Sequence, residues 1–264
     1  VKMNILLAFK LDPDASMLAE KDWQVAERDT CGPDVSLLRN AIGADEQAAA
    51  ALLLAQRSVG CEISLTALNI GDERALHWLH YFAALGFEHQ VLLEAAGDLR
   101  FSPSFIAGQL ADWQRSRGAE VIVTGCQSSE GLNGQTPFLL AEILNWPCVT
   151  QVERFTLEPP FVVVAQRTTS GVRRCRVRLP AVIAVRQCGE VALPVPGMRQ
   201  RLGAAKAEVM RQAVAVEATP AVQCLRLARP EQRRSAVIIE GATAQEKART
   251  CLLYTSDAAD EEDS

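Results

Sequence analysis

The sequence predicts an α/β fold of three layers, with a mainly parallel sheet between two layers of helices. Continuous apolar segments, typical of strands buried on both faces, alternate with helical segments up to Pro147. This alternation favours parallel strands, because strand–helix–strand crossovers are right-handed and return the chain to the same sheet. After Pro147 the β-rich segments follow one another, which predicts antiparallel hairpins added to the sheet.

The parallel part contains the elements with the clearest signals. Strands are expected at residues 4–9, 63–70, 91–94 and 121–124. Helices are expected at residues 46–57, 73–85 and 103–113, with Asp45, Asp72 and Ser102 placed to cap them. Residues 15–35 have a mixed composition, which does not assign them to a helix or a strand.

The second half is predicted to be richer in strands. We expect strands at residues 149–155, 161–168, 172–179 and 181–185, separated by prolines and by a Ser-Gly turn. A loop over residues 186–199 follows, then an amphipathic helix at 203–217. The acidic, polar tail from Leu252 is expected to be disordered.

Composition excludes several classes of function. The 264 residues carry a net charge of −5 without a basic run, which argues against nucleic acid as a partner. The eight cysteines form no C-x-x-C pair, so we expect reduced thiols, no metal and a cytoplasmic protein. The three histidines match no metal-binding pattern, and we expect neither a membrane span nor a signal peptide.

The stretch from Gly125 to Pro147 is the candidate binding site. It joins a buried strand to an apolar helix through a loop with glycines, hydroxyls and a proline at the first helical position. We expect Thr136 to cap that helix and the turn Gly134-Gln135-Thr136 to hold a phosphate, because a helix N-terminus has free N–H groups and a positive dipole end. Gly125 would let the backbone approach the ligand closely, and Ser128 and Ser129 would add hydrogen bonds to the phosphate.

The remaining contacts follow from the order of the strands. In a parallel sheet ligands bind beyond the carboxyl ends of the strands, where strand order reverses. The main chain of Ala8 and Ile70 would then meet an adenine ring, and Glu130 would accept from a ribose hydroxyl. Two alternatives stay open: a glycine-rich loop without a ligand, and a solvated Glu130.

The sequence resembles the beta subunit of electron-transferring flavoproteins over about residues 3–210, and within that family an enterobacterial branch. The segments that carry the resemblance are MNILLAFK, DEQAAAALLLA, ALNIGDERALHWLHYFAALGF, TGCQSSEGLNGQTPFLLAEILNWP and RTTSGVRRCRVRLPAVIAV. The resemblance implies the α/β fold shared with adenine nucleotide alpha hydrolases, in a nucleotide-binding domain over residues 1–200 with a hairpin-rich segment at 149–185. Residues 201–264 would form a C-terminal helical arm and tail.

The resemblance also implies a function. Such a subunit pairs with an alpha subunit and is an electron carrier without catalytic residues of its own. The pair holds a FAD that takes electrons from flavin dehydrogenases, and the beta subunit binds AMP or a second FAD. Carried onto this chain, the nucleotide contacts are Ala8, Asn69, Ile70, Gly125, Gln127, Ser128, Ser129, Glu130, Gly134, Gln135 and Thr136.

Two departures from the family pattern concern the partners. Arginines follow the Gly171 turn where the family usually has acids, and Leu193-Pro194-Val195-Pro196 stands where some relatives carry a Pro-Arg-aromatic docking sequence. We expect a flavin-dependent dehydrogenase to dock on the loop 186–199, although an acyl-CoA dehydrogenase is not supported. The alternative function is a stand-alone adenine-nucleotide-binding regulator like the universal stress proteins, which would have no use for the segment 149–185.

Overall fold

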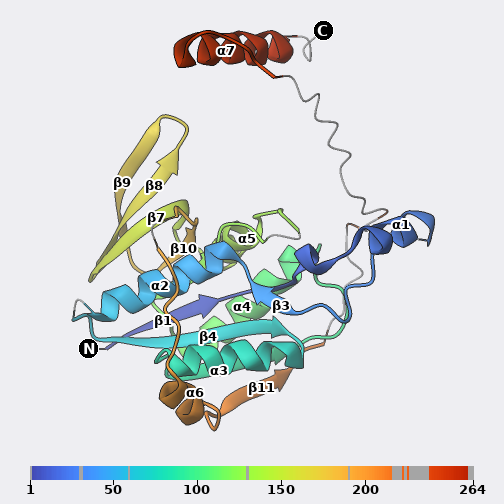
Figure 1. Ribbon diagram of the computed structural model, residues 1–264. Helices are drawn as coiled ribbons and strands as arrows, with labels where there is room; N and C mark the ends of the chain where they lie inside the picture. The colour runs from blue at the N-terminus through green and yellow to red at the C-terminus, as the bar shows by residue number, and fades with distance from the viewer. Residues whose placement is uncertain are drawn as a thin grey trace. The chain divides into compact units, whose positions relative to one another are not determined.

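The protein is described by a computed structural model, whose central element is a nine-stranded, mostly parallel sheet (Figure 1). The structure describes residues 2–29, 32–58, 60–128, 131–189, 191–215, 222, 225 and 238–260. The strand order is β11-β5-β4-β1-β6-β10-β7-β8-β9, and a separate two-stranded sheet pairs β2 with β3. The three-layer α/β fold predicted from the sequence is therefore confirmed.

The elements of the large sheet and its helices have the following bounds. The strands are β1 Met3–Ala8, β4 Ile63–Gly71, β5 His89–Glu94, β6 Val121–Gly125, β7 Cys148–Glu158, β8 Phe161–Thr168, β9 Gly171–Arg178, β10 Ala181–Val185 and β11 Val209–Ala213. The α-helices are α1 Glu20–Asp29, α2 Ala44–Ser58, α3 Leu76–Ala84, α4 Pro103–Arg117, α5 Thr136–Leu144, α6 Met198–Ala204 and α7 Ala244–Asp260. The short elements are β2 Leu11–Pro13, β3 Asn40–Ile42 and the 3-10 helices η1 Ala15–Met17 and η2 Glu73–Ala75.

Strand β1 marks the point where the order of the strands reverses. It pairs in parallel with β4 on one side and with β6 on the other, with Leu7 opposite both Ala67 and Val123. The chain builds β4 and β5 on the first side and then returns through α4 to β6 on the second. The carboxyl ends of β1, β4 and β6 therefore lie side by side, which is where a parallel sheet binds its ligands.

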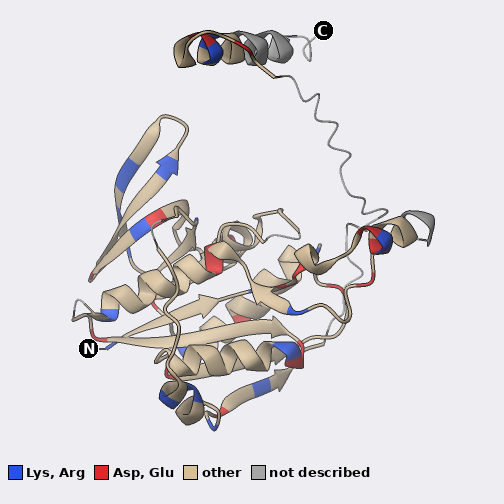
Figure 2. Cartoon of the chain, in the orientation of Figure 1, with Lys and Arg blue, Asp and Glu red and all other residues tan. Residues whose placement is uncertain are grey.

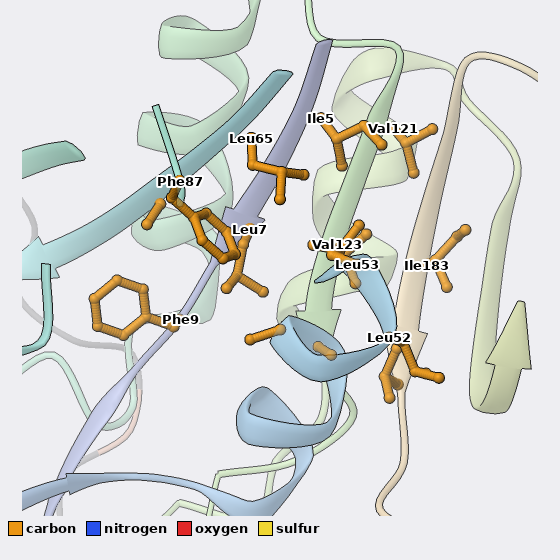
Figure 3. Packing of buried hydrophobic residues seen from close by; sticks show 14 of the residues in the cluster. Ile5, Leu7, Phe9, Leu52, Leu53, Leu65, Phe87, Val121, Val123 and Ile183 are labelled. Carbon is orange, nitrogen blue, oxygen red and sulfur yellow. The ribbon is translucent and has the colours of Figure 1, made fainter. Parts of the chain in front are cut away.

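Alternate side chains of the strands pack on opposite layers of helices. Ile5 and Leu7 of β1 belong to a core with α2 and α3, whereas Leu6 and Ala8 belong to a core with α4 and α5. Charged residues lie mostly outside these two cores, although Lys and Arg form bands on β8 and β9 (Figure 2). Figure 3 shows the first core, where Leu53 of α2 lies close to the side chains of the strands.

The hairpin segment extends the sheet as predicted. β7 pairs in parallel with β10 and antiparallel with β8, and β8 pairs antiparallel with β9, which ends the sheet. The outer strand β9 carries the basic side chains Arg173, Arg174, Arg176 and Arg178, all of them exposed. Arg176 lies over the ring of Phe161 at 3.9 Å from its centroid, so part of this charge is held against the neighbouring strand.

The helix predicted over residues 203–217 is wrong. The chain forms the short helix α6 and then β11, which pairs in parallel with β5 at the other edge of the sheet. Met210 of β11 packs on the core under α4, so the apolar residues of this segment serve a strand. The segment has only a weak preference for helix. Pairing with the edge strand β5 therefore determines its structure, because tertiary contacts override weak local preferences.

Other local predictions also need correction. Residues 20–29, left without an element, form α1. Asp45 lies inside α2 and does not cap it, because α2 begins at Ala44. Ser102 precedes α4 without a side-chain cap bond, and α4 continues past Trp113 to Arg117.

The tail from Leu252 is helical up to Asp260, contrary to the expected disorder. The helix α7 begins with a capping arrangement that we overlooked, in which the backbone N–H of Glu246 donates to Thr243 Oγ1 at 3.2 Å. The side chain of Glu246 accepts from the backbone N–H of Ala242 at 3.0 Å. The bond to Thr243 satisfies an N–H group that a helix start leaves free, and the bond from Ala242 ties the preceding chain to the first turn.

The chain separates into two compact units, residues 1–227 and 228–264. The domain boundary expected after residue 200 stays a prediction. Within the described ranges, no helix has the length and apolar character needed to span a bilayer.

Candidate functional site

A cavity of about 580 Å³ opens beyond the carboxyl ends of β1, β4 and β6. Its wall includes the ends of these three strands, the start of α5, and segments that follow β1 and β5. The volume lies in the range of roughly 300–1,000 Å³ that is usual for small-molecule sites. The strand ends predicted to converge therefore do form one pocket.

Eight of the predicted contact residues line this cavity: Ala8, Asn69, Ile70, Gly125, Gln127, Ser128, Gly134 and Thr136. Gln135 does not line it; the residue is exposed and forms the N-cap position of α5. Ser129 and Glu130 lie outside the described residues, so the ribose contact predicted for Glu130 stays a prediction.

The side chain of Asn69 holds two strand ends together. Its Nδ2 donates to the carbonyl oxygen of Phe9 at 2.9 Å, and the residue is only 3% exposed. The amide therefore ties the end of β4 to the end of β1. Ala8 and Ile70 both line the cavity, and their contact with a flat ring stays a prediction.

Hydrogen bonds within the loop after β6 give it a compact shape. Gln127 Nε2 donates to the carbonyl oxygen of Leu132 at 2.8 Å, and the N–H of Gly131 donates to Ser128 Oγ at 3.2 Å. The N–H of Gln135 donates to Asn133 Oδ1 at 3.2 Å. Ser128 thus stabilises the loop, which is a structural task beyond the ligand contact predicted for it.

The first turn of α5 opens into the cavity. The helix begins at Thr136 with Pro137 behind it, and no side-chain hydrogen bond caps it, contrary to the prediction for Thr136. Gly134, just before it, has a φ of 58°, a conformation that favours glycine. Pro137 has no N–H group, and the N–H groups of Phe138 and Leu139 both donate to the carbonyl oxygen of Gln135 at 3.1 Å. The N–H group of Thr136 and the positive end of the helix dipole are therefore left for an anion.

Basic side chains in the wall were missed by the sequence reasoning. Lys10, Arg74 and Arg100 line the cavity, and each forms an ion pair with a nearby aspartate, at 2.6 Å to Asp12, 2.6 Å to Asp72 and 2.7 Å to Asp98. The arginine side chain of the Asp72 pair holds the pKa of that carboxyl below its usual range, and the Asp98 pair behaves in the same way. Lys10 follows the end of β1 by two residues, and Arg74 follows the end of β4 by three. This position close to the strand ends could have indicated that both side chains line the pocket.

The start of α2 contributes one acid to the wall, Glu46, and Asp45 precedes it in the chain. Asp45 accepts from the N–H of Gln187 at 2.8 Å and from the N–H of Gln127 at 3.2 Å, so it joins α2 to the loops after β10 and β6. Glu46 lines the cavity and is 5% exposed, and burial raises the pKa of its carboxyl to about 7. The sequence predicted Asp45 as the cap and Glu46 as the first residue of a helix, without indicating these contacts.

The cysteine in the wall is a neutral thiol at physiological pH. Burial raises the pKa of Cys126 to about 11, and its Sγ donates to the carbonyl oxygen of Ala184 at 3.2 Å. A thiol with a raised pKa is a poor nucleophile, so Cys126 belongs to the packing of the wall.

Comparison with known proteins identifies the family. A profile of the electron transfer flavoprotein domain matches residues 44–217, which include the loop after β6 and the start of α5. The chain belongs to the electron transfer flavoprotein family. The resemblance inferred from the sequence motifs is therefore confirmed.

Individual relatives of this electron transfer flavoprotein subunit agree with that assignment. A protein of Escherichia coli named "Putative electron transfer flavoprotein subunit YgcR" is 68% identical over 94% of this chain and 95% of its own length. A protein of Mycobacterium tuberculosis named electron transfer flavoprotein subunit beta is 29% identical over 48% of either chain. One of Bacillus subtilis with the same name is 21% identical over 74% of this chain and 78% of its own.

The chemistry of the cavity fits an adenine nucleotide. A wall of main chain and apolar side chains at β1 and β4 suits a flat ring, and a helix start without a side-chain cap suits a phosphate. These groups can bind and orient a ligand.

Proposed function

We propose that this chain is the beta-type subunit of an electron transfer flavoprotein and binds AMP, or a second FAD, in the cavity beyond β1, β4 and β6. The observation that carries the proposal is the uncapped start of α5 opening into a cavity of about 580 Å³ in a chain of this family. The phosphate would lie at Gly134 and Thr136, and the adenine along Ala8, Asn69 and Ile70.

The chemistry of electron transfer would come from flavin. A FAD shared with an alpha subunit would accept electrons and pass them on, whereas this chain would hold its nucleotide, position the flavin partner and contribute no catalytic residue. The family assignment and the beta subunits among the relatives support the pairing with an alpha subunit. We also propose that the pair is cytoplasmic. The cysteines of the described residues are free thiols, which suits a reducing compartment.

The loop 186–199 would contact the flavin-dependent dehydrogenase that supplies the electrons. Tyr81 Oη donates to the carbonyl oxygen of Pro194 at 3.1 Å, and Arg201 Nε donates to that of Pro196 at 3.1 Å, so α3 and α6 hold this loop in place. Leu193 packs on the core, whereas Val195 is 76% exposed and Met198 73% exposed. Val195 and Met198 are therefore the better candidates for contact.

A visible spectrum tests the proposed function. The chain would be produced together with an alpha-type subunit, purified as a pair, and measured for flavin absorption and for nucleotide released on denaturation. We expect a yellow pair that releases an adenine nucleotide. A colourless preparation that releases none would contradict the proposal, and a colourless single chain that binds AMP would favour the stand-alone regulator.

A substitution in the loop separates docking from assembly. Val195→Asp should lower the rate at which a dehydrogenase reduces the pair, because a charge replaces an exposed apolar contact. Bound flavin and AMP should stay at the wild-type amounts. An unchanged rate with the dehydrogenase that serves the wild-type pair would exclude Val195 from the docking surface.

A further inference from the structure

Glu46, in the cavity wall, has a buried carboxyl oxygen without a hydrogen-bond partner. Glu46 Oε2 is buried and has none among the residues that the structure describes. Burying a polar atom without a partner costs about 1–3 kcal/mol, so such atoms usually have a function or meet a ligand. Because Glu46 lines the cavity, a ligand bound there can supply the missing partner.

Two glycines leave room for this carboxyl group. A Cβ at Gly43 would lie 2.4 Å from Glu46 Oε2, and a Cβ at Gly125 would lie 2.8 Å from Glu46 Cδ. Both distances are too short for any other residue type without displacing Glu46. The chain therefore has space for this side chain at two positions, one of which is the end of β6.

The charged groups around Glu46 are mostly acidic. Asp12 of β2 and Asp45 of α2 both raise the pKa of Glu46 in addition to burial, and Lys10 after β1 opposes them. Lys10 is itself paired with Asp12 at 2.6 Å. A phosphate is therefore unfavourable beside Glu46, and an uncharged part of a ligand is favoured.

A metal ion is a weaker explanation for these acids. In the part of the chain that the structure describes, no group of three or more His, Cys, Asp or Glu is arranged to hold one. The Asp45 carboxylate is already engaged by the N–H groups of Gln127 and Gln187. Glu46 is thus left to meet an uncharged ligand group.

We propose that Glu46 binds the adenosine part of the nucleotide as a neutral carboxyl group, taking up a proton from solvent when the ligand binds and releasing it when the ligand leaves. The neutral carboxyl donates its hydrogen to a ring nitrogen or a ribose oxygen, which gives Glu46 the partner it lacks. The phosphate then lies at Gly134 and Thr136, as in the proposed function. This inference rests on the proposed function, because it concerns the nucleotide in the same cavity.

Calorimetric titration of the full chain with adenosine and with AMP tests the inference between pH 7 and 8.5. Over this range the secondary phosphate group of AMP is already ionised, since its pKa is about 6, and adenosine has no phosphate. The affinity of the wild type for both ligands should fall, by up to about tenfold per pH unit, because binding takes up one proton. Glu46→Gln, which cannot titrate, should bind with an affinity that does not change with pH.

A matched variant controls for the loss of a negative charge. Glu62→Gln changes an exposed residue before the amino end of β4, away from the cavity. This variant should keep the pH dependence of the wild type. If Glu46→Gln follows the wild-type profile, or if the wild-type affinity is flat, the inference is overturned while nucleotide binding and the proposed function stand.

A second readout needs no variant and covers the case in which Glu46→Gln does not fold. Binding enthalpies of adenosine to the wild type, measured at one pH in buffers of different ionisation enthalpy, give the number of protons exchanged. We expect net uptake near pH 7.5, up to one proton per ligand. Zero uptake or a net release would overturn the inference, and absence of binding by both ligands would contradict the proposed function as well.

Discussion

At the scale of single residues, Asp45 joins α2 to the loops after β6 and β10. Its carboxylate accepts from the N–H groups of Gln127 and Gln187, which belong to two different loops. Asp45→Ala leaves both groups without this acceptor and should lower the free energy of unfolding by roughly 1–3 kcal/mol in urea titrations. Asp112→Ala, which removes only an exposed pair with Arg115, should change it by less than about 0.5 kcal/mol. Equal effects of the two variants would show that Asp45 has no such role.

Glu46 should make stability depend on pH. The pKa of its carboxyl rises from 4.5 to about 7 on folding, so between these values the folded chain holds a proton that the unfolded chain has lost. Its contribution is therefore largest below pH 4.5 and is lost as the pH rises through 7. The free energy of unfolding of Glu46→Gln relative to the wild type should thus increase by roughly 3 kcal/mol between pH 4.5 and 8, at 1.36 kcal/mol per pKa unit. Parallel pH profiles for the two proteins would contradict this.

The sequence predicted the loop that contributes to the pocket, but it did not predict the roles of Asp45 and Glu46. Gly125, Gly134 and Thr136 could be predicted because their roles depend on the local geometry of the chain. The strand–loop–helix pattern of the sequence indicates that geometry. The role of Glu46 depends on its burial and on Asp12, which comes from a different element. Contacts of that kind are set by tertiary packing, and one sequence does not display them.

At the scale of elements, Gln56 connects α2 to the hairpin segment. Its Nε2 donates to the carbonyl oxygen of Phe155 at 3.0 Å, and its Oε1 accepts from the N–H of Leu157 at 3.0 Å. Gln56→Ala leaves two backbone groups of β7 unsatisfied in a buried place and should cost roughly 1–3 kcal/mol in the free energy of unfolding. Gln24→Ala, on the exposed side of α1, is the matched control and should be near neutral.

The core under α2 gives a second prediction for an element. Leu53 is fully buried between α2 and the strands (Figure 3), so Leu53→Ala should lower the free energy of unfolding by about 2–5 kcal/mol. The measurement is again a urea titration. A loss below about 1 kcal/mol would show that the helix packs more loosely on the sheet than described.

The elements that the sequence predicted well are those with continuous apolar strands and strong turn residues. β1, β4, β6 and β10 are buried on both faces, and their composition reflects this directly. The strand β11 was not predicted because it is an edge strand with exposed Arg211 and Gln212. Its sequence pattern resembles that of a helix, and only its pairing with β5 makes it a strand. The helix α1 was not predicted because its sequence contains few apolar residues at a regular spacing.

At the scale of the whole molecule, the chain is a scaffold in which a parallel sheet brings three strand ends and one helix start to a single cavity. The outer hairpins and the loop 186–199 lie outside that cavity and are left for partners in the proposed function. The fold class and the family could be predicted from the sequence, because several motifs occur in the family's order. The identity of the partners could not, since Arg173 and its neighbours depart from the family pattern.

The most direct test of the account is the nucleotide content of the purified protein. Denaturing the wild-type pair and measuring the released compounds by mass spectrometry should give about one AMP or FAD per chain, in addition to the FAD shared with the alpha subunit. Gly134→Val should release markedly less, because its backbone at a φ of 58° disfavours a β-branched residue and the phosphate turn would be distorted. A wild-type pair that releases no nucleotide beyond the shared FAD would contradict the account.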